Sequence, residues 1–401
     1  MDVVDRYLTL GLRLGRHVEG LVDAYYGPPA LAEAVDGEEL RPAAALAGDA
    51  DDLLAELDGS GLEAQRSGWL RDQLVGLRAY AGLLAGERLD YLDEVERCYG
   101  VRPERVPEAV FAAAHERLEE LLPGAGSLTE RYDAWRTANA VPPGRVLEVM
   151  VPLLALLRER TAAFVELPAG EEFGLELVSD EPWLAFNYYL GGRRSRIVVN
   201  TDLPFTGSEL VTLAAHEGYP GHHTERAVKE WLLVEERGHL EESLQLVPTP
   251  QALLSEGIAE LGIELVAGDA ISAEVAAIFA AAGLGFDAEE ARSIRDAREP
   301  LATVTRNAAI QVHEDGASVE EARAYVARWA LAPPHRAERM VAFALDPTWR
   351  AYVTTYTEGL RLCRAFVDGD LGAFRRLLSE PVRVGELIAA AGGEPAVSST
   401  P

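Results

Sequence analysis

Metal-binding residue types are most concentrated in one segment of the chain, which reads AAHEGYPGHHTER. His216 and Glu217 begin it like the His-Glu-x-x-His signature, in which two histidines one helical turn apart bind zinc and the glutamate is a general base. Pro220 stands where the second histidine belongs, and His222 and His223 follow later than the signature requires. The segment therefore predicts a zinc site on the condition that its helix is not straight.

The spacing of the histidines shows why the helix must be distorted. On a straight helix His216 and His223 share a face but lie ~10 Å apart, which is too far for one ion. Pro220 removes a helical hydrogen bond and Gly221 relaxes the backbone, so we expect a bulge or kink between the histidines. A two-residue widening brings His222 to the place of the missing histidine, with His223 as the alternative ligand or as a residue that supports the ligands. The competing interpretation is that His222 and His223 are solvated residues after a helix break.

A capping box predicts where this helix begins. Thr206 and Glu209 have the spacing at which each side chain caps the backbone of the other residue. Leu210, Leu213 and Glu217 then fall on one helical face, which places the Glu217 carboxyl on an apolar side. Burial there favours the neutral form and raises the pKa of the carboxyl, which suits a general base that works near neutral pH.

A third ligand is expected from another segment, because a catalytic zinc ion usually has three protein ligands and an open position. The segment TPQALLSEGIAELGIELVAG predicts a helix, with Thr249 as its N-cap and Pro250 at its first position. Glu256 and Glu260 lie together beside the apolar stripe of that helix. Both are candidates for the third ligand, and Glu260 is also a candidate for a supporting residue. The alternative interpretation of both is a solvated helical face.

Two of these segments resemble a known family. HEGYPGHH is similar to the His-Glu-x-x-Pro-Gly-His-His motif of the bacterial domain-of-unknown-function family number 885, and SEGIAE is similar to the Glu-Gly-x-Ala helix of that family. The same helical element supplies the glutamate ligand in aminopeptidases of the gluzincin group. The resemblance implies one zinc ion per chain with a set of ligands and a base, namely His216, His222 or His223, and Glu256 as ligands and Glu217 as the base.

The resemblance extends over residues 173–366. SRIVVNTDLP stands where the family has a strand that ends in Asn-Thr, and TTYTEGLRLCRAF resembles a Tyr-x-x-Gly helix of the family. Tyr356 matches the tyrosine of that helix. The resemblance implies that its hydroxyl donates to the oxyanion that develops during hydrolysis. The alternative interpretation is an aromatic residue of the core or of the helix surface.

Three further residues are candidates for substrate binding. Asn200 ends a predicted strand, where it is placed to help an extended peptide pair along the sheet edge, although a turn residue is the alternative. Arg306 and His313 offer groups that hold a substrate carboxylate. Their alternative interpretations are a salt-bridged arginine and a solvated histidine.

The periodicity predicts a mostly α protein with two helical lobes around a cleft and one small antiparallel β-sheet. The resemblance implies that this architecture is gluzincin-like. Apolar residues at helical spacing predict a helical N-terminal lobe over 1–166. Residues 167–391 are predicted to form the zinc-binding catalytic region, with the sheet at about 173–200. Residues 392–401 are predicted to be a frayed tail.

Composition narrows the partners and the location. The chain has 401 residues and a formal net charge of −29, which disfavours nucleic acid and anionic membranes as partners. The N-terminal stretch lacks the basic start and the apolar core of a signal peptide, and no run reaches the length of a membrane span. Cys98 and Cys363 are far apart, which favours two reduced thiols. We therefore expect a cytoplasmic protein.

Together these features predict a zinc-dependent metallopeptidase that cleaves small peptides. One alternative is a metal-dependent hydrolase of a non-peptide amide or ester. Another is a helical metal-binding protein without catalytic activity. Glu217 favours an enzyme, because a protein that only binds metal does not need a carboxylate beside its first ligand. The sequence makes no prediction of the oligomeric state.

Overall fold

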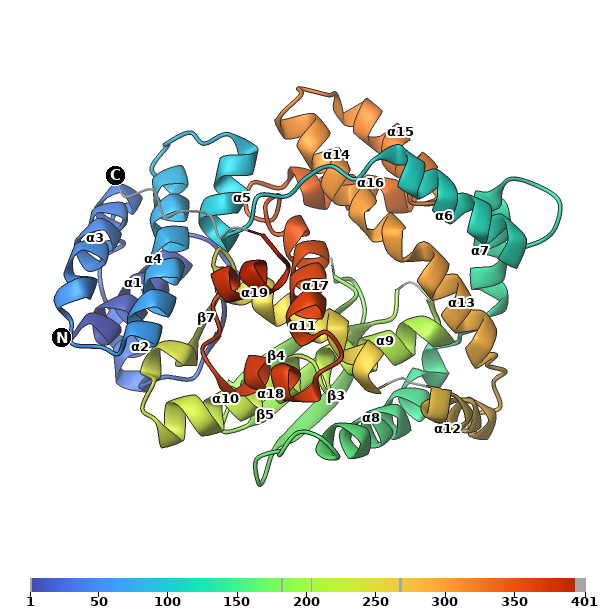
Figure 1. Ribbon diagram of the computed structural model, residues 1–401, viewed down its shortest axis with the longest axis horizontal. Helices are drawn as coiled ribbons and strands as arrows, with labels where there is room; N and C mark the ends of the chain where they lie inside the picture. Colours follow the sequence, from blue (N-terminus) through green and yellow to red (C-terminus); the bar gives the residue numbers. More distant parts are fainter. Residues whose placement is uncertain (1, 182, 203, 267–268, 394–401) are drawn as a thin grey trace.

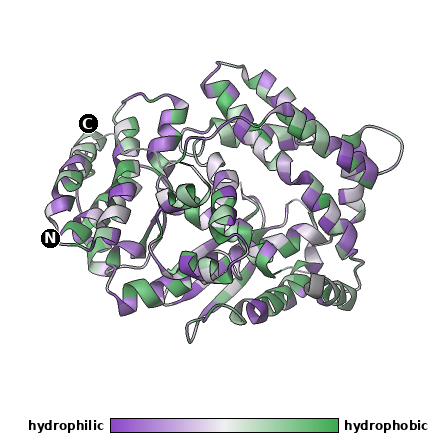
Figure 2. Ribbon diagram, in the orientation of Figure 1, coloured by the Kyte–Doolittle hydropathy of each residue, from purple (hydrophilic) through white to green (hydrophobic). Residues whose placement is uncertain are grey.

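Helices dominate the structure, as the sequence predicts (Figure 1). It is a computed structural model that describes residues 2–181, 183–202, 204–266 and 269–393. Most of the predicted tail, residues 394–401, lies outside the described residues. Figure 2 shows that most helices carry both hydrophobic and hydrophilic residues, which is typical of helices that bury one face and expose the other.

The N-terminal part of the chain forms eight α-helices, which are α1 (Val3–Gly15), α2 (Pro29–Asp36), α3 (Ala43–Glu56), α4 (Ala64–Leu84), α5 (Tyr91–Tyr99), α6 (Glu108–Leu121), α7 (Leu128–Ala138) and α8 (Val146–Ala162). The helices after the central sheet are α9 (Gly207–Glu217), α10 (His222–Lys229), α11 (Pro250–Val266), α12 (Asp269–Ala281), α13 (Ala288–Arg298), α14 (Val304–His313), α15 (Val319–Trp329), α16 (Pro334–Leu345), α17 (Val353–Val367), α18 (Leu371–Ser379) and α19 (Val384–Ala390). The strands are β1 (Val22–Tyr25), β2 (Ala140–Val141), β3 (Glu172–Val178), β4 (Ala185–Gly191), β5 (Arg194–Asn200), β6 (Phe205–Thr206) and β7 (Leu244–Leu246).

The predicted sheet is present at the expected place, but it is mixed rather than antiparallel. Its strand order is β3-β5-β4, with β5 antiparallel to β4 and parallel to β3. A tight turn at Gly192 and Arg193 makes β4 and β5 a hairpin, and both residues, like Gly191 before them, adopt positive φ angles. The chain reverses direction between β3 and β4 and again between β4 and β5, so β3 and β5 run in the same direction. Since β3 pairs with the free edge of β5 and not with β4, this pair is parallel. The described residues also form two further sheets of two strands each, β1–β7 and β2–β6, where the sequence predicts a single sheet.

Four large hydrophobic clusters hold the helices together. One joins α1, α3 and α4 to β7, and a second joins α6 and α7 to α13, α14, α15 and α16. A third packs α8 and α9 against the sheet and α12, and a fourth joins α5, α11, α17, α18 and α19. Each cluster contains residues from both sides of residue 166. The division of the chain at residue 166 into two lobes around a cleft remains a prediction.

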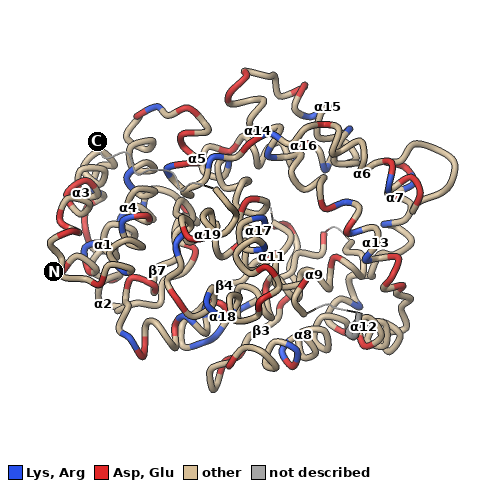
Figure 3. The backbone as a smooth tube through the Cα atoms, in the orientation of Figure 1, with Lys and Arg blue, Asp and Glu red and all other residues tan. Residues whose placement is uncertain are grey.

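Two other expectations bear on the environment of the chain. Cys98 and Cys363 are both buried and free, in agreement with the prediction of two unpaired thiols. Within the described ranges, no helix combines the length and the apolar composition needed to cross a membrane. Acidic residues are spread over the helices at both ends of the molecule, as the net charge of −29 requires (Figure 3).

Candidate metal centre

Helix α9 begins at the predicted capping box. Thr206 is its N-cap and accepts a hydrogen bond from the backbone N–H of Glu209, while the Glu209 carboxylate accepts from the backbone N–H of Thr206. The helix ends at Glu217, and α10 begins at His222. The distortion predicted between the histidines is therefore a complete break, in which the Tyr219–Pro220 peptide bond is cis.

Gly221 is the residue that lets the chain pass close to the last turn of α9 at this break. Its N–H donates to the carbonyl of Ala215 at 2.9 Å. A Cβ atom at position 221 would lie 1.9 Å from the carbonyl oxygen of His216 and 2.5 Å from that of Ala215. Only glycine fits so close to a backbone. Gly262 of α11 makes a similar space on the other side, where a Cβ would lie 2.9 Å from the ring of Pro220.

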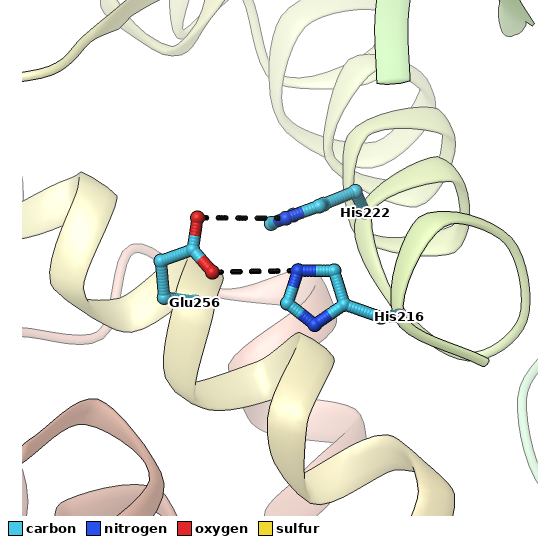
Figure 4. A group of neighbouring side chains, drawn as sticks. All are labelled: His216, His222 and Glu256. Atoms are coloured by element: carbon cyan, nitrogen blue, oxygen red, sulfur yellow. Dashed lines mark ion pairs between the residues drawn. The ribbon is translucent and has the colours of Figure 1, made fainter. Parts of the chain in front are cut away.

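The break brings two histidines and a glutamate together. His216 Nε2 lies 3.4 Å from Glu256 Oε2, and His222 Nε2 lies 3.7 Å from Glu256 Oε1 (Figure 4). The two imidazole rings are perpendicular, with centroids 4.7 Å apart. One ligand atom from each of the three residues lies within 4.8 Å of the others, which is the spacing of ligands around a single ion.

The three residues fit a divalent metal ion. Glu256 Oε2 is buried and has no hydrogen-bond partner among the described residues, which is costly for a carboxylate oxygen unless a cation binds it. Two imidazole nitrogens and one carboxylate oxygen are a donor set that zinc uses in catalytic sites. The other carboxylate oxygen, Glu256 Oε1, accepts a hydrogen bond from the Tyr352 hydroxyl at 2.5 Å. This bond fixes the orientation of the carboxylate.

Glu260 supports His216 from the opposite side of the ring. Its Oε1 lies 3.4 Å from His216 Nδ1, so the imidazole stands between two carboxylates. Burial by itself lowers the pKa of His216, but Glu256 and Glu260 raise it well above its usual range. Glu260 is therefore placed to orient His216, and its role as a supporting residue or a further ligand remains a prediction.

His223 points away from this cluster, so the geometry favours His222 over His223 as the ligand. Its Nδ1 lies 2.8 Å from Ser195 Oγ and its Nε2 lies 2.9 Å from Glu171 Oε2. Glu171 also accepts hydrogen bonds from Tyr219 and Arg158. The order serine, histidine, glutamate has the form of a catalytic triad, but Ser195 is only 3% exposed and His223 is fully buried. We assign this cluster to anchoring α10 on the sheet.

Glu217 is buried beside the three candidate ligands. Burial raises the pKa of its carboxyl to about 7, while the charge of His216 lowers the pKa and that of Glu256 raises it. The direction is the one expected from its place on the apolar face of α9.

Tyr356 is half-buried, and its hydroxyl makes no hydrogen bond to any described residue. Burial, followed by the charges of Glu256 and Glu260, holds the pKa of Tyr356 well above its usual range, so the hydroxyl keeps its proton.

The three candidates for substrate binding all make contacts within the protein. The Asn200 amide donates to two backbone carbonyls and its Oδ1 accepts from a backbone N–H, which is the turn role considered as its alternative. Arg306 is 4% exposed and is paired with Glu358. His313 Nε2 lies 2.9 Å from the carbonyl oxygen of Ala344, so this histidine is bonded to the backbone rather than solvated. Substrate contacts of these three residues remain predictions.

Several residues around the site escaped the sequence analysis. Tyr352 lies four positions before Tyr356 on the same face of the helix, a signal that the sequence carried. Asp23 of β1 is ion-paired with Arg226 of α10, and its charge acts on Glu217 and Tyr356. Asp23 lies 203 positions before Arg226 in the sequence. No local pattern could have connected it with them.

Comparisons with known proteins support the fold. No family model matches the sequence, and a search of the curated proteins finds no match. Two bacterial structures, each described as a "putative lipoprotein", are similar to this chain. The one from Colwellia psychrerythraea is 13% identical with a TM-score of 0.53, over 91% of this chain and 69% of that chain. The one from Shewanella oneidensis, of unknown function, is 14% identical with a TM-score of 0.50, over 90% and 76%.

A third similar structure is the M32 carboxypeptidase from Deinococcus radiodurans R1. It is 13% identical with a TM-score of 0.41, over 99% of this chain and 94% of that chain. Membership of family 885 remains a prediction.

Proposed function

We propose that this protein is a zinc-dependent hydrolase that cleaves small peptides. The observation that carries the proposal is the cluster of His216, His222 and Glu256, whose ligand atoms lie within 4.8 Å of one another. Glu217 follows the first of these residues directly and is buried beside them. A site that only stored or transported metal would not need this carboxylate. The resemblance of HEGYPGHH and SEGIAE to zinc peptidase motifs adds the peptide substrate to the proposal.

The metal in this proposal is one zinc ion per chain. Zinc takes two histidines and one carboxylate as ligands and keeps a fourth position open for water or substrate. When bound, such an ion polarises a carbonyl group and makes water more acidic. Tyr352 holds Glu256, and Glu260 holds His216, so the ligands are oriented before the ion arrives.

The remaining steps are assigned to two side chains of this protein. Glu217 accepts a proton from the attacking water and passes it to the leaving amine, which requires a carboxyl that changes its protonation state near neutral pH. The Tyr356 hydroxyl donates a hydrogen bond to the oxyanion that forms on the substrate carbonyl. Its hydroxyl has no hydrogen-bond partner among the described residues, which supports this role because it leaves the hydroxyl available to bind substrate.

Other features bear on partners and location. The net charge of −29 supports the proposal that neither nucleic acid nor an anionic membrane is a partner. The two free thiols favour the cytoplasm, where thiols stay reduced. The description of the two similar structures as lipoproteins points instead to the cell envelope. We propose the cytoplasm, and fractionation of cells that express the natural gene would decide between the two.

The experiment that tests this function combines metal analysis with a substrate screen. Protein purified without chelator is analysed for zinc, and a mixed peptide library is followed by mass spectrometry with and without chelator. We expect one zinc per chain and cleavage products that chelator abolishes. Zinc binding without cleavage of peptides, but with chelator-sensitive hydrolysis of esters or other amides, would move the proposal to a different hydrolase. A protein that takes up no zinc when zinc is added would overturn the proposal.

A further inference from the structure

The second ring nitrogen of His222 leads into a chain of buried polar groups. Its Nδ1 lies 3.1 Å from Ser255 Oγ, and that hydroxyl donates to Glu225 Oε2 at 2.6 Å. Lys229 Nζ donates to the other carboxylate oxygen, Glu225 Oε1, at 2.7 Å. All three supporting residues are at most 4% exposed. Glu225 and Lys229 lie on α10, and Ser255 lies on α11 directly before Glu256.

The charges along this chain set the direction of its hydrogen bonds. Burial by itself lowers the pKa of Lys229, but the carboxylate of Glu225 and that of Glu242 raise it, so the ammonium keeps its charge. A carboxylate paired with an ammonium group accepts hydrogen bonds and donates none. Ser255 has a single hydroxyl proton, which it donates to Glu225. Its oxygen therefore accepts from His222, and the proton of the neutral imidazole resides on Nδ1.

A proton on Nδ1 leaves a lone pair on Nε2. This is the nitrogen of His222 that faces Glu256, at 3.7 Å from Oε1. The ring must offer a lone pair at that position to bind a metal ion. The opposite tautomer would present an N–H there and would have to rearrange first.

We propose that Lys229, Glu225 and Ser255 are positioning residues that hold His222 in the tautomer able to bind the metal. The inference rests on the proposed metal site and adds three residues to it. Outer partners of this kind typically change metal affinity by about 10- to 100-fold when they are replaced. The hydrogen bonds among these three residues also join α10 to α11, the two helices that carry His222 and Glu256.

Glu225→Gln provides a sharp test, because Lys229 should select the orientation of the new amide. The amide oxygen turns toward the ammonium, so its NH₂ group faces Ser255. The serine then accepts from the amide and donates its own proton to His222 Nδ1. We expect the metal-free variant to carry its imidazole proton on Nε2, whereas the wild type carries it on Nδ1. Long-range ¹H–¹⁵N spectra of the histidine side chains at neutral pH distinguish the two tautomers.

Zinc affinity is the second measurement, made by competition with a colorimetric chelator. We expect Ser255→Ala and Glu225→Gln to weaken zinc binding about 10- to 100-fold. Ser255→Thr keeps a hydroxyl at this position and should bind zinc almost as tightly as the wild type. Ser195→Ala is the matched control. It removes the same kind of serine–histidine hydrogen bond, here 2.8 Å between Ser195 Oγ and His223 Nδ1, from a histidine that lies outside the candidate metal site. Circular dichroism and thermal unfolding check that each variant is folded.

The outcomes separate this inference from the proposed function. A wild-type tautomer with its proton on Nε2, or zinc affinity unchanged in both Ser255→Ala and Glu225→Gln, would overturn the positioning role while leaving the metal site in place. A wild-type protein without zinc binding would overturn the proposed function. In that case the spectra of the metal-free protein would still test the direction of the hydrogen bonds.

Discussion

Gly257 of α11 and Gly359 of α17 bring two helix backbones into direct contact. A Cβ atom at position 257 would lie 2.4 Å from the carbonyl carbon and oxygen of Gly359, and one at position 359 would lie 2.4 Å from the carbonyl oxygen of Leu253. Gly257 follows the candidate ligand Glu256. Tyr352 is the N-cap of α17, and Tyr356 lies in the first turns of that helix. The contact therefore sets the distance between the candidate ligand and the two tyrosines.

Gly257→Ala should separate these helices. We expect a loss of about 1–3 kcal/mol in the free energy of unfolding, the usual cost of overpacking, together with weaker zinc binding because the Tyr352 hydroxyl moves away from Glu256. Urea denaturation and a zinc titration measure the two effects. Gly48→Ala is the control, since Gly48 lies in α3 with open space around it and should gain about 0.5–1 kcal/mol. Equal effects of the two substitutions would contradict the helix contact.

Glu217→Gln tests the general base. The amide keeps the shape of the side chain but accepts no proton, so zinc should stay bound while turnover of a cleaved peptide falls by about 10²–10⁴. Elemental analysis and steady-state kinetics provide the two measurements. Full activity that chelator still abolishes would show that Glu217 is not the base, even with the zinc site intact.

Glu256→Gln should act on the metal rather than on the proton transfer. A neutral amide is a poorer ligand than a carboxylate, because it lacks the negative charge that attracts a cation. We expect zinc content after dialysis to fall well below one per chain and activity to fall with it. If this variant retained zinc at wild-type affinity, another residue would have to be the third ligand.

Tyr356→Phe removes the proposed oxyanion donor and nothing else from the site. Zinc binding should be unchanged and kcat should fall by about 10²–10³, the cost of one such hydrogen bond. KM should change little, because the bond strengthens in the transition state. Tyr352→Phe is the comparison, since it removes the bond to Glu256 and should lower zinc affinity first. A change confined to KM would assign Tyr356 to substrate binding.

The ion pair of Arg136 with Glu209 at the start of α9 predicts a pH dependence of stability. Burial by itself raises the pKa of Glu209, but Arg136 and the backbone N–H of Thr206 lower it below its ordinary value of 4.5. This contribution is therefore present above about pH 4.5 and is lost as the pH falls through the lower pKa of the folded state. Arg136→Met should cost about 1 kcal/mol at neutral pH, the value of a partly exposed pair, and less below pH 4. Urea denaturation over this pH range measures it, and a difference that grows in acid would contradict it.

Local features of the site could be predicted from the sequence. The capping box of Thr206 and Glu209, the break at Pro220, and the helix that carries Glu256 all depend on residues a few positions apart. Backbone sterics, missing N–H groups and side-chain caps act over that range, so the letters alone determine them. The motif also indicated His216 as a ligand before any geometry was known.

Only the tertiary structure decided the choice between His222 and His223 and the direction of β3. His222 faces Glu256, and His223 is drawn to Glu171 and Ser195, because the sheet and α11 approach α10 from different sides. β3 runs parallel to β5 because it joins the edge that the hairpin leaves open. The orientation of the histidines depends on partners that are 28 to 52 positions away from them in the sequence. Burial of polar groups demands a partner for each of them, but it is the packing of the whole chain that selects which one.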